Sequence, residues 1–210
     1  RPDVVNHHAA QVDVRRSTAD PLFDADVNVM GTVNLLQHAA ECGAPRFIFI
    51  SSGGAVYGEP TELPVDEGQD PRPLCPYGAS KLAAESYVAL YGAAHGADWT
   101  VLRYGNVYGP RQDPRGEAGV VAIFAGQMLS DRTCTIHGDG TQQRDFVFVD
   151  DCVRANELAL EVGEGSAIYN IGTGRPSSVN DVFAALARAT GYTRPAIHGP
   201  PKPGETYRIF

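Results

Sequence analysis

The segment Arg46-Phe47-Ile48-Phe49-Ile50-Ser51 is almost continuously apolar, and it runs into a turn of small residues at 52–58, SGGAVYG. Strands without alternation of polar and apolar residues are typical of parallel sheets that are covered on both faces. Similar short runs at 3–7 and 99–103 alternate with helical patterns at 26–42 and 77–96. This alternation predicts an α/β fold with a doubly wound parallel sheet.

The composition of the chain changes after Gly109-Pro110. Mixed elements follow: an apolar stretch at 120–129, a Gly-rich strand pair around 137–140, a helix at 149–161, a strand at 168–171 and a helix at 179–190. We therefore predict two units. Residues 1–109 form most of the parallel sheet, and residues 110–210 form a smaller, mixed α/β lobe that is interleaved with the first unit.

Composition narrows the class of protein. The 210 residues are 43% hydrophobic with a net charge of −8, which suits a globular core and disfavours nucleic acid or an anionic membrane as partner. No apolar run approaches the ~20 residues of a membrane span, and no signal peptide is recognisable, so we expect a cytoplasmic protein. The four cysteines lie far apart without C-x-x-C spacing, which indicates neither a metal site nor a disulfide framework.

Tyr77 and Lys81 form the first chemical signal. They are four residues apart in the segment PYGASK at 76–81, and on a helix this spacing puts both side chains on one face. A cation near a phenol favours the phenolate and lowers the pKa of the tyrosine. The pair therefore predicts a proton-transfer device, although a Y-x-x-x-K spacing alone also occurs by chance on solvated helices.

Three predicted strands end in unusual turns. Their sequences are HHAAQ at 7–11, SSGGAVYG at 51–58 and RYGNVYGP at 103–110. In open α/β sheets, functional residues gather at the carboxyl ends of the strands. Each turn alone is equally well explained as a polar loop, but all three together with the Tyr77–Lys81 pair predict a functional site at this edge.

These motifs closely resemble the extended short-chain dehydrogenase/reductases, specifically the NAD-dependent epimerase/dehydratase family typified by UDP-glucose 4-epimerase. The resemblance covers essentially the whole chain and implies a Rossmann-like fold. It rests on seven motifs in the family's order: His7-His8-Ala9-Ala10, Asn28-Val29-Met30-Gly31-Thr32, 51–58, Tyr77 with Lys81, Leu102-Arg103-Tyr104-Gly105-Asn106, Gln143-Arg144-Asp145-Phe146-Val147 and Lys202-Pro203-Gly204-Glu205.

The chain departs from the family pattern at its start. The family begins with a strand and a Gly-rich turn whose helix N-terminus holds the NAD pyrophosphate. Here the first strand matches the family's fourth, so roughly 60 residues, two βα units of about 30 each, are not in the sequence. We therefore expect an N-terminally truncated Rossmann-like sheet, either a fragment or an ordered core.

The resemblance implies NAD as cofactor and assigns residues to it. Tyr77 and Lys81 are expected at the nicotinamide ribose, and Tyr77 is expected to exchange the proton of the sugar hydroxyl. The family's catalytic hydroxyl falls on Gly53 when counted back from 56–58, so Ser52 is the nearest candidate and Ser51 the second. The other residues expected to line the cofactor are His8, Ala9, Ala10, Gln11, Asn28, Ser51 and Tyr104.

The resemblance also implies a UDP-sugar substrate. Asn106 and Arg144 match residues that bind the diphosphate, and Thr135 and His137 match residues that flank the uracil. Glu205 matches a residue at the nucleotide ribose. Lys202 stands where Arg is usual, so a compact ammonium replaces the planar guanidinium that binds phosphate through two parallel hydrogen bonds. A half-buried turn histidine and an ion pair with Asp145 or Asp150 remain alternative interpretations of His137 and Arg144.

The residues in the turn at 51–58 distinguish which reaction of the family the sequence favours. In sugar 4,6-dehydratases an Asp-Glu pair matches Gly54 and Ala55, and a residue without a proton cannot protonate a leaving hydroxyl. The sequence therefore favours a 4-epimerase, and a non-catalytic sugar-nucleotide-binding module remains the alternative. Relatives form dimers through a four-helix bundle, so we expect 26–42 and 77–96 to form one, with Leu35 and Leu90 in its seam.

Overall fold

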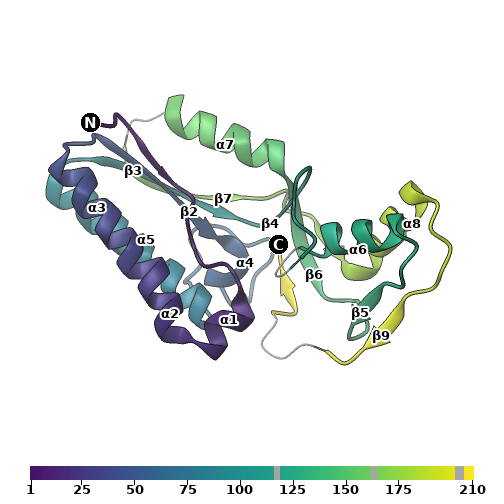
Figure 1. The fold of residues 1–210 in the computed structure, drawn as a ribbon. Helices are drawn as coiled ribbons and strands as arrows, with labels where there is room; N and C mark the ends of the chain where they lie inside the picture. The colour runs from purple at the N-terminus through teal and green to yellow at the C-terminus, as the bar shows by residue number, and fades with distance from the viewer. Residues whose placement is uncertain (116–118, 162–164, 202–205) are drawn as a thin grey trace.

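The structure is a computed structural model that describes residues 1–115, 119–161, 165–201 and 206–210 (Figure 1). Its main sheet has four parallel strands in the order β1-β2-β3-β7. They are β1 (Val5–His7), β2 (Arg46–Ser52), β3 (Asp98–Tyr104) and β7 (Ala167–Ile171). The predicted Rossmann-like α/β fold is confirmed, and β7, from the second half of the chain, completes this sheet.

Helices cover both faces of the main sheet (Figure 1). On one face lie α3 (Gly31–Glu41) and the long α5 (Pro76–His95), and on the other lies α7 (Val149–Glu161). Pro76 occupies the first turn of α5, and Gly96, with φ 65°, ends it. The core between α3, α5 and the sheet consists of Leu36, Phe47, Phe49, Ala84, Val88 and Val101.

The helix predicted at 26–42 differs from the observed one. Two short helices, α1 (Val14–Ala19) and α2 (Pro21–Ala25), precede this segment. A π-helical turn, η1 (Asp26–Met30), lies between α2 and α3. A π turn inserts one extra residue into a helix and often marks a functional site. Here it carries the buried Asn28.

The smaller lobe is built from short strands and two helices. β6 (Gln143–Phe148) pairs with β4 (Asn106–Tyr108), β8 (Pro176–Ser178) and β10 (Arg208–Ile209), while β5 (Thr135–His137) pairs with β9 (Ile197–Gly199). The prediction of a strand pair around 137–140 is therefore wrong, because β5 and β6 do not pair with each other but with other strands. α6 (Val120–Leu129) and α8 (Val179–Thr190) pack around Phe124, Met128, Cys134, Ile136 and Tyr192.

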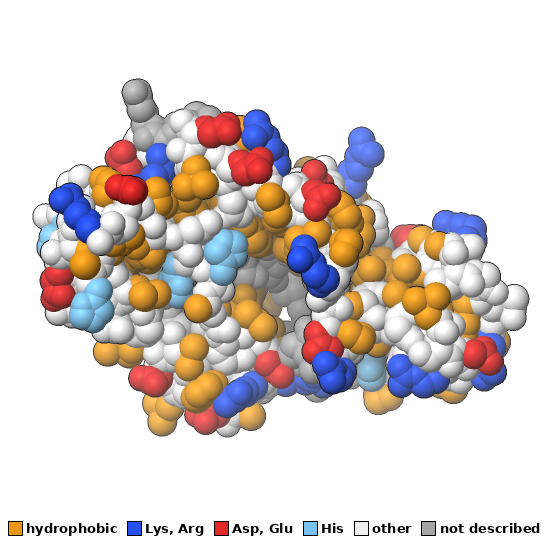
Figure 2. Space-filling view, turned by 45° about the horizontal axis from the view of Figure 1, so that its top comes forward, with side chains coloured by type: hydrophobic (Ala, Val, Ile, Leu, Met, Phe, Trp, Pro, Cys, Tyr) orange, Lys and Arg blue, Asp and Glu red, His pale blue; other side chains and the backbone are white. Residues whose placement is uncertain are grey.

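Figure 2 shows a hollow between the larger body and the smaller lobe. On the face drawn there, acidic and basic side chains are interspersed rather than gathered by sign. Among the described helices, none has the length and apolar character that crossing a membrane requires. The carboxyl ends of β2 and β3 continue into α4 (Gly53–Val56) and β4, so the turns singled out in the sequence lie together.

Candidate active site

The structure brings Ser52 and Tyr77 together. Ser52 is the last residue of β2 and precedes α4, yet its hydroxyl makes no capping hydrogen bond to that helix. Instead it lies close to the phenol of Tyr77, in the first turn of α5, where it lowers the pKa of that phenol. A serine hydroxyl and a tyrosine phenol therefore face the same point, as a shared contact with one substrate hydroxyl requires.

A close approach of backbones makes this contact possible. A Cβ atom at Gly78 would lie 2.4 Å from the carbonyl oxygen of Ala55 and 2.9 Å from Cβ of Pro73, closer than carbon and oxygen atoms can pack. Glycine therefore lets the start of α5 touch the turn that follows β2. The position of Tyr77 next to Ser52 depends on this contact.

Lys81 lies one turn further along α5 and is only 4% exposed. Its Nζ atom is 4.3 Å from the ring centroid of Phe49, at the distance of a cation–π contact. Burial lowers the pKa of Lys81 to about 8, although the charges of Glu85 and Asp24 oppose this. Burial thus brings the pKa of this ammonium close to neutral pH, where it can gain or lose a proton more readily than an exposed lysine.

The prediction that a neighbouring cation lowers the pKa of Tyr77 is wrong for this structure. Burial raises the pKa of the phenol, and the charge of Asp24 raises it further, whereas the hydrogen bond from Ser52 lowers it. The ammonium of Lys81 lies against Phe49 instead. Desolvation therefore outweighs the stabilisation of the phenolate that the spacing alone predicted.

Ser51 does not face the site, contrary to its predicted place beside the cofactor. It is 3% exposed, and its hydroxyl donates a 2.5 Å hydrogen bond to Oε1 of Glu85. Arg103 binds the same carboxylate with two bonds of 3.0 and 2.6 Å and donates to the hydroxyl of Tyr57. The Ser51 hydroxyl is therefore engaged inside the core, whereas Ser52 is the serine that lies beside Tyr77.

The turn after β1 has the shape of a cofactor cradle. His8 and Ala9 are exposed and Ala10 is half-buried, and the two alanines carry no atoms beyond Cβ. Asn28 fixes this turn by two hydrogen bonds to the backbone of Gln11. Its Oδ1 accepts from the amide at 2.8 Å, and its Nδ2 donates to the carbonyl at 3.0 Å. Small side chains beside a buried cation, Lys81, fit a dinucleotide whose phosphate and ribose approach the backbone.

Three predicted cofactor residues have other partners. The side chain of Gln11 donates to Asp24 at 2.7 Å, and that of Asn28 donates to Ser80 at 3.1 Å. Both are buried, so they brace the cradle rather than line it. The hydroxyl of Tyr104 bonds Asn156 of α7, and burial raises the pKa of Tyr104 to about 12. The structure does not bring this phenol to Tyr77.

A cavity of about 210 Å³ lies beside the turn at 52–58. Its wall includes Gly53, Gly54, Arg103, Asn106, Asp145, Asn170, Gly172, Ile209 and Phe210. Asp145 is the one carboxylate among its lining residues, and its oxygens already accept bonds of 2.7 to 2.9 Å from Thr173 and Gly174. Among the described residues, the cavity is therefore lined by glycine, amide and apolar groups together with Tyr57 and Arg103, and its one carboxylate is already hydrogen-bonded.

Four of the predicted nucleotide-binding residues lie on strands of the smaller lobe: Asn106, Thr135, His137 and Arg144. Asn106 lines the cavity, whereas Thr135 and His137 lie on β5, away from its wall. Arg144 lies on β6, and its Nη1 donates to the carbonyls of Gln143 and Tyr207. Lys202 and Glu205 lie outside the described residues.

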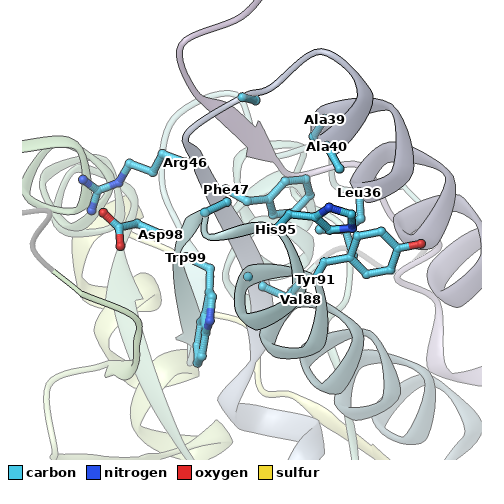
Figure 3. Close-up of a pocket in the computed structure, with 13 residues that line it drawn as sticks. Leu36, Ala39, Ala40, Arg46, Phe47, Val88, Tyr91, His95, Asp98 and Trp99 are labelled. Atoms are coloured by element: carbon cyan, nitrogen blue, oxygen red, sulfur yellow. The ribbon is translucent and has the colours of Figure 1, made fainter.

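A second crevice lies at the opposite end of the sheet, where β2 and β3 begin (Figure 3). Figure 3 shows Leu36 of α3, Val88 and Tyr91 of α5, and Trp99 of β3 around it. Its volume of about 20 Å³ is close to the space of a single water molecule. It is too small for a nucleotide and lies far from Ser52 along the strand.

Sequence reasoning missed several buried polar residues. Glu85 follows Lys81 by four residues, a spacing that places it on the same helix face and could have been noticed. His7 was passed over for His8, yet it is the buried one: its Nε2 is 3.0 Å from Oγ1 of Thr32, and burial and the charge of Lys81 lower its pKa to about 4. Asp24 carried no signal, because an Asp in a helical stretch is ordinarily solvated.

With this geometry in place, the comparisons with known proteins identify the family. The pattern of the NAD-dependent epimerase/dehydratase family matches residues 1–172, and the chain belongs to that family. A putative UDP-glucose 4-epimerase of Methanocaldococcus jannaschii is 48% identical over 99% of this chain and 68% of its own length. The chain thus spans about two thirds of this relative.

Two solved structures are also similar. The UDP-glucose 4-epimerase of Thermotoga maritima with UDP-glucose is 46% identical, with a TM-score of 0.97 over 100% of this chain and 68% of that one. The UDP-glucose 4-epimerase of Thermus thermophilus in complex with NAD is 44% identical, with a TM-score of 0.92 over 99% and 68%. The family and the cofactor class predicted from the sequence are confirmed.

Proposed function

We propose that this protein is an NAD-dependent 4-epimerase of nucleotide sugars, of the UDP-glucose and UDP-galactose type. The observation that carries the proposal is the contact of Ser52 with Tyr77 beside the buried Lys81. This arrangement lies next to a cavity whose described lining holds one carboxylate, Asp145, already hydrogen-bonded to Thr173 and Gly174. Similarity to UDP-glucose 4-epimerases over nearly the whole chain supports the same activity.

The proposed chemistry assigns one task to each side chain. Tyr77 takes the proton of the sugar 4-hydroxyl and later returns it, and Ser52 holds that hydroxyl against the phenol. Lys81 stabilises the phenolate once the site is closed to water, because a cation favours the charged form most strongly where water is excluded. NAD, when bound, supplies the acceptor and donor of the C4 hydride.

The turn after β2 supports epimerisation over elimination. A Cβ atom at Gly54 would lie 3.9 Å from Oγ of Ser52 and 3.7 Å from Oδ1 of Asn106, so an acid at this position would reach the reacting part of the sugar. Glycine and alanine at 54 and 55 offer no proton there. Loss of the 6-hydroxyl needs such a donor, whereas epimerisation at C4 needs only Tyr77.

A UDP-sugar is the proposed substrate, with Asn106 and Arg144 toward the diphosphate. Arg144 carries the planar fork that phosphate oxygens prefer. The apolar wall of Ile209 and Phe210, together with Gly172, leaves space around the sugar ring that also suits uronic acid or N-acetylated sugars. Thr135 and His137 remain proposals for the uracil, because β5 lies in the same lobe as Arg144.

We also propose a homodimer in which α3 and α5 of each subunit form a four-helix bundle. Leu35 and Leu90 are 37% and 59% exposed, so they do not face the sheet. Met30 and Tyr87, on the same two segments of helix, are exposed as well. Light scattering at micromolar concentration measures the assembly, and a monomeric mass would count against it.

One incubation tests the activity. The complete gene product, loaded with NAD, is mixed separately with UDP-glucose, UDP-glucuronate, UDP-N-acetylglucosamine and dTDP-glucose, and the products are separated by chromatography. We expect the 4-epimer of at least one UDP-sugar. A 4-keto-6-deoxy sugar from any of the four would overturn the proposal, and binding without turnover would favour a sugar-nucleotide-binding module.

A further inference from the structure

Asp24 is a carboxylate enclosed under the Tyr77–Lys81 pair. It lies in α2, which packs against α5, and it is 1% exposed. Its Oδ1 accepts hydrogen bonds of 2.7 Å from Gln11 and 3.2 Å from Asn28. Its Oδ2 is equally buried and has no hydrogen-bond partner among the described residues. A buried carboxylate whose hydrogen-bond donors, among the described residues, are neutral amides is costly, and such a cost calls for a functional reason.

The position of Asp24 connects it to the catalytic face of α5. Asn28, which donates to Asp24, also donates to Ser80, and Ser80 donates to the backbone carbonyl of Tyr77 at 2.9 Å. The carboxylate thus belongs to a chain of hydrogen bonds that ends at the helix turn carrying Tyr77 and Lys81. The same chain holds the cradle through the backbone of Gln11.

We propose that Asp24 is a positioning residue for the Tyr77–Lys81 pair, whose buried negative charge sets the pH range in which the pair exchanges protons. The proposal rests on the function proposed above for the pair. Asp24 touches neither substrate nor cofactor in this account. It acts through its charge and through the hydrogen bonds of Asn28 and Ser80.

The charged and titratable groups around the pair come from several packed elements. Lys81 faces Glu85 on its own helix, His7 of β1, Phe49 of β2 and Asp24 of α2. Glu85 is held by two bonds from Arg103, which offset its charge, and His7 stays neutral near pH 7 because its pKa is about 4.

Burial is the main cause that raises the pKa of Tyr77. The charges of Asp24 and Cys75 raise this pKa further, and Ser52 lowers it. Asp24 is therefore the carboxylate near both groups whose charge no described cation pairs with directly. Its negative charge favours the protonated form of each, so replacing it by a neutral side chain should lower the proton affinity of both Lys81 and Tyr77.

The direct test uses the low lysine content of the chain. Its lysines are Lys81 and Lys202, and in protein labelled with ¹³C at lysine Cε the side-chain signal that disappears in Lys81→Arg is that of Lys81. Titration of the Lys81 signal measures its proton affinity without substrate or cofactor. We expect Asp24→Asn to weaken that affinity by about threefold or more, as removal of a buried neighbouring charge does.

The matched control is Asp26→Asn, which removes the same charge from an exposed aspartate two residues away. It should leave the Lys81 titration unchanged, and Asp24→Glu, which keeps the charge, should retain most of the proton affinity. If Asp24→Asn does not fold, Asp24→Ser carries the same expectation, since its hydroxyl can still accept from Gln11 or Asn28. A Lys81 titration equal to the wild type in a folded neutral variant would overturn the proposal.

The pH dependence of kcat/KM in the complete, NAD-loaded gene product gives the second readout. Both limbs of the profile should move to lower pH in Asp24→Asn and stay in place in Asp26→Asn. A residue with a merely structural role would lower the rate without moving the limbs. If the titration shifts as expected but no epimer forms with any UDP-sugar, the inference on Asp24 stands and the proposed function fails.

Discussion

Ser51 and Glu85 are joined by a 2.5 Å hydrogen bond between Oγ and Oε1, inside the core and one residue before the hydroxyl that faces Tyr77. Because Arg103 binds the same carboxylate, Ser51 belongs to a buried ionic network, whereas Ser52 belongs to the candidate site. The two neighbouring serines therefore have separable tasks. This separation gives a matched pair of variants.

Ser51→Ala should lower stability and leave catalysis nearly unchanged. It removes a hydrogen bond to a buried carboxylate, which typically costs about 1.5–3 kcal/mol in the free energy of unfolding. Ser52→Ala should do the reverse, with a reduced kcat and a nearly unchanged midpoint of urea denaturation. If Ser51→Ala slowed the reaction and Ser52→Ala did not, the assignment of the catalytic hydroxyl to Ser52 would be wrong.

Tyr77→Phe should abolish epimerisation but leave binding of the nucleotide sugar nearly intact. The change removes the proton acceptor and alters little of the shape, and loss of a positioned general base costs about 10²–10⁴-fold in rate. The loss should exceed that of Ser52→Ala. Calorimetric titration with UDP-sugar is the control, because it shows whether Tyr77→Phe still binds the nucleotide sugar. Unchanged rates of epimerisation in Tyr77→Phe would exclude the phenol as the proton acceptor.

Gly78→Ala should misplace Tyr77. The new Cβ would meet the carbonyl oxygen of Ala55 at 2.4 Å, so the start of α5 must move, and displacement of a catalytic group by about 1 Å can cost on the order of 10²-fold in kcat. Gly31→Ala is the matched control in α3, where the nearest atom would be 3.9 Å away. That variant should keep its activity and gain up to about 1 kcal/mol of stability from helix propensity.

His7 should make folding sensitive to mild acid. Its pKa is lowered from 6.5 to about 4, so between these values the unfolded chain binds a proton that the folded protein does not. The stability contributed by the neutral, buried ring is fully present above about pH 6.5 and is lost as the pH falls toward 4.

The measurement for His7 is the free energy of unfolding by urea at a series of pH values. The wild type should lose about 2–3 kcal/mol more than His7→Gln on going from pH 7 to pH 4. His8→Gln, which alters the exposed neighbour, should follow the wild-type curve. Parallel curves for wild type and His7→Gln would contradict the expected burial of a neutral His7.

The sequence was sufficient for the elements that carry strong periodic or apolar patterns. The strand at 46–51 and the helix at 77–96 were predicted within one residue of β2 and α5, because four apolar or aromatic positions in a row and a Pro start with a Gly stop are local signals. The Tyr77–Lys81 pair followed from spacing on that helix. These features depend on neighbours in the chain and need no knowledge of the fold.

The rest depended on contacts between distant segments. The π turn at 26–30 has no sequence signal, and it is what places Asn28 against Gln11. Ser51 and Ser52 could not be distinguished until the structure showed that Ser51 bonds Glu85 inside the core while Ser52 lies beside Tyr77. The raised pKa of Tyr77 reflects burial, a property of the packed protein, and the spacing to Lys81 said nothing about it.

The fate of the hydrogen at sugar C4 tests the central claim most directly. The complete gene product, loaded with NAD, is incubated with UDP-glucose carrying deuterium at C4, and the product is examined by mass spectrometry and NMR. The account predicts UDP-galactose that keeps the deuterium at C4, because Tyr77 exchanges only the hydroxyl proton and no acid at 54 or 55 promotes elimination. Deuterium at C6 of a product that has lost water would contradict it.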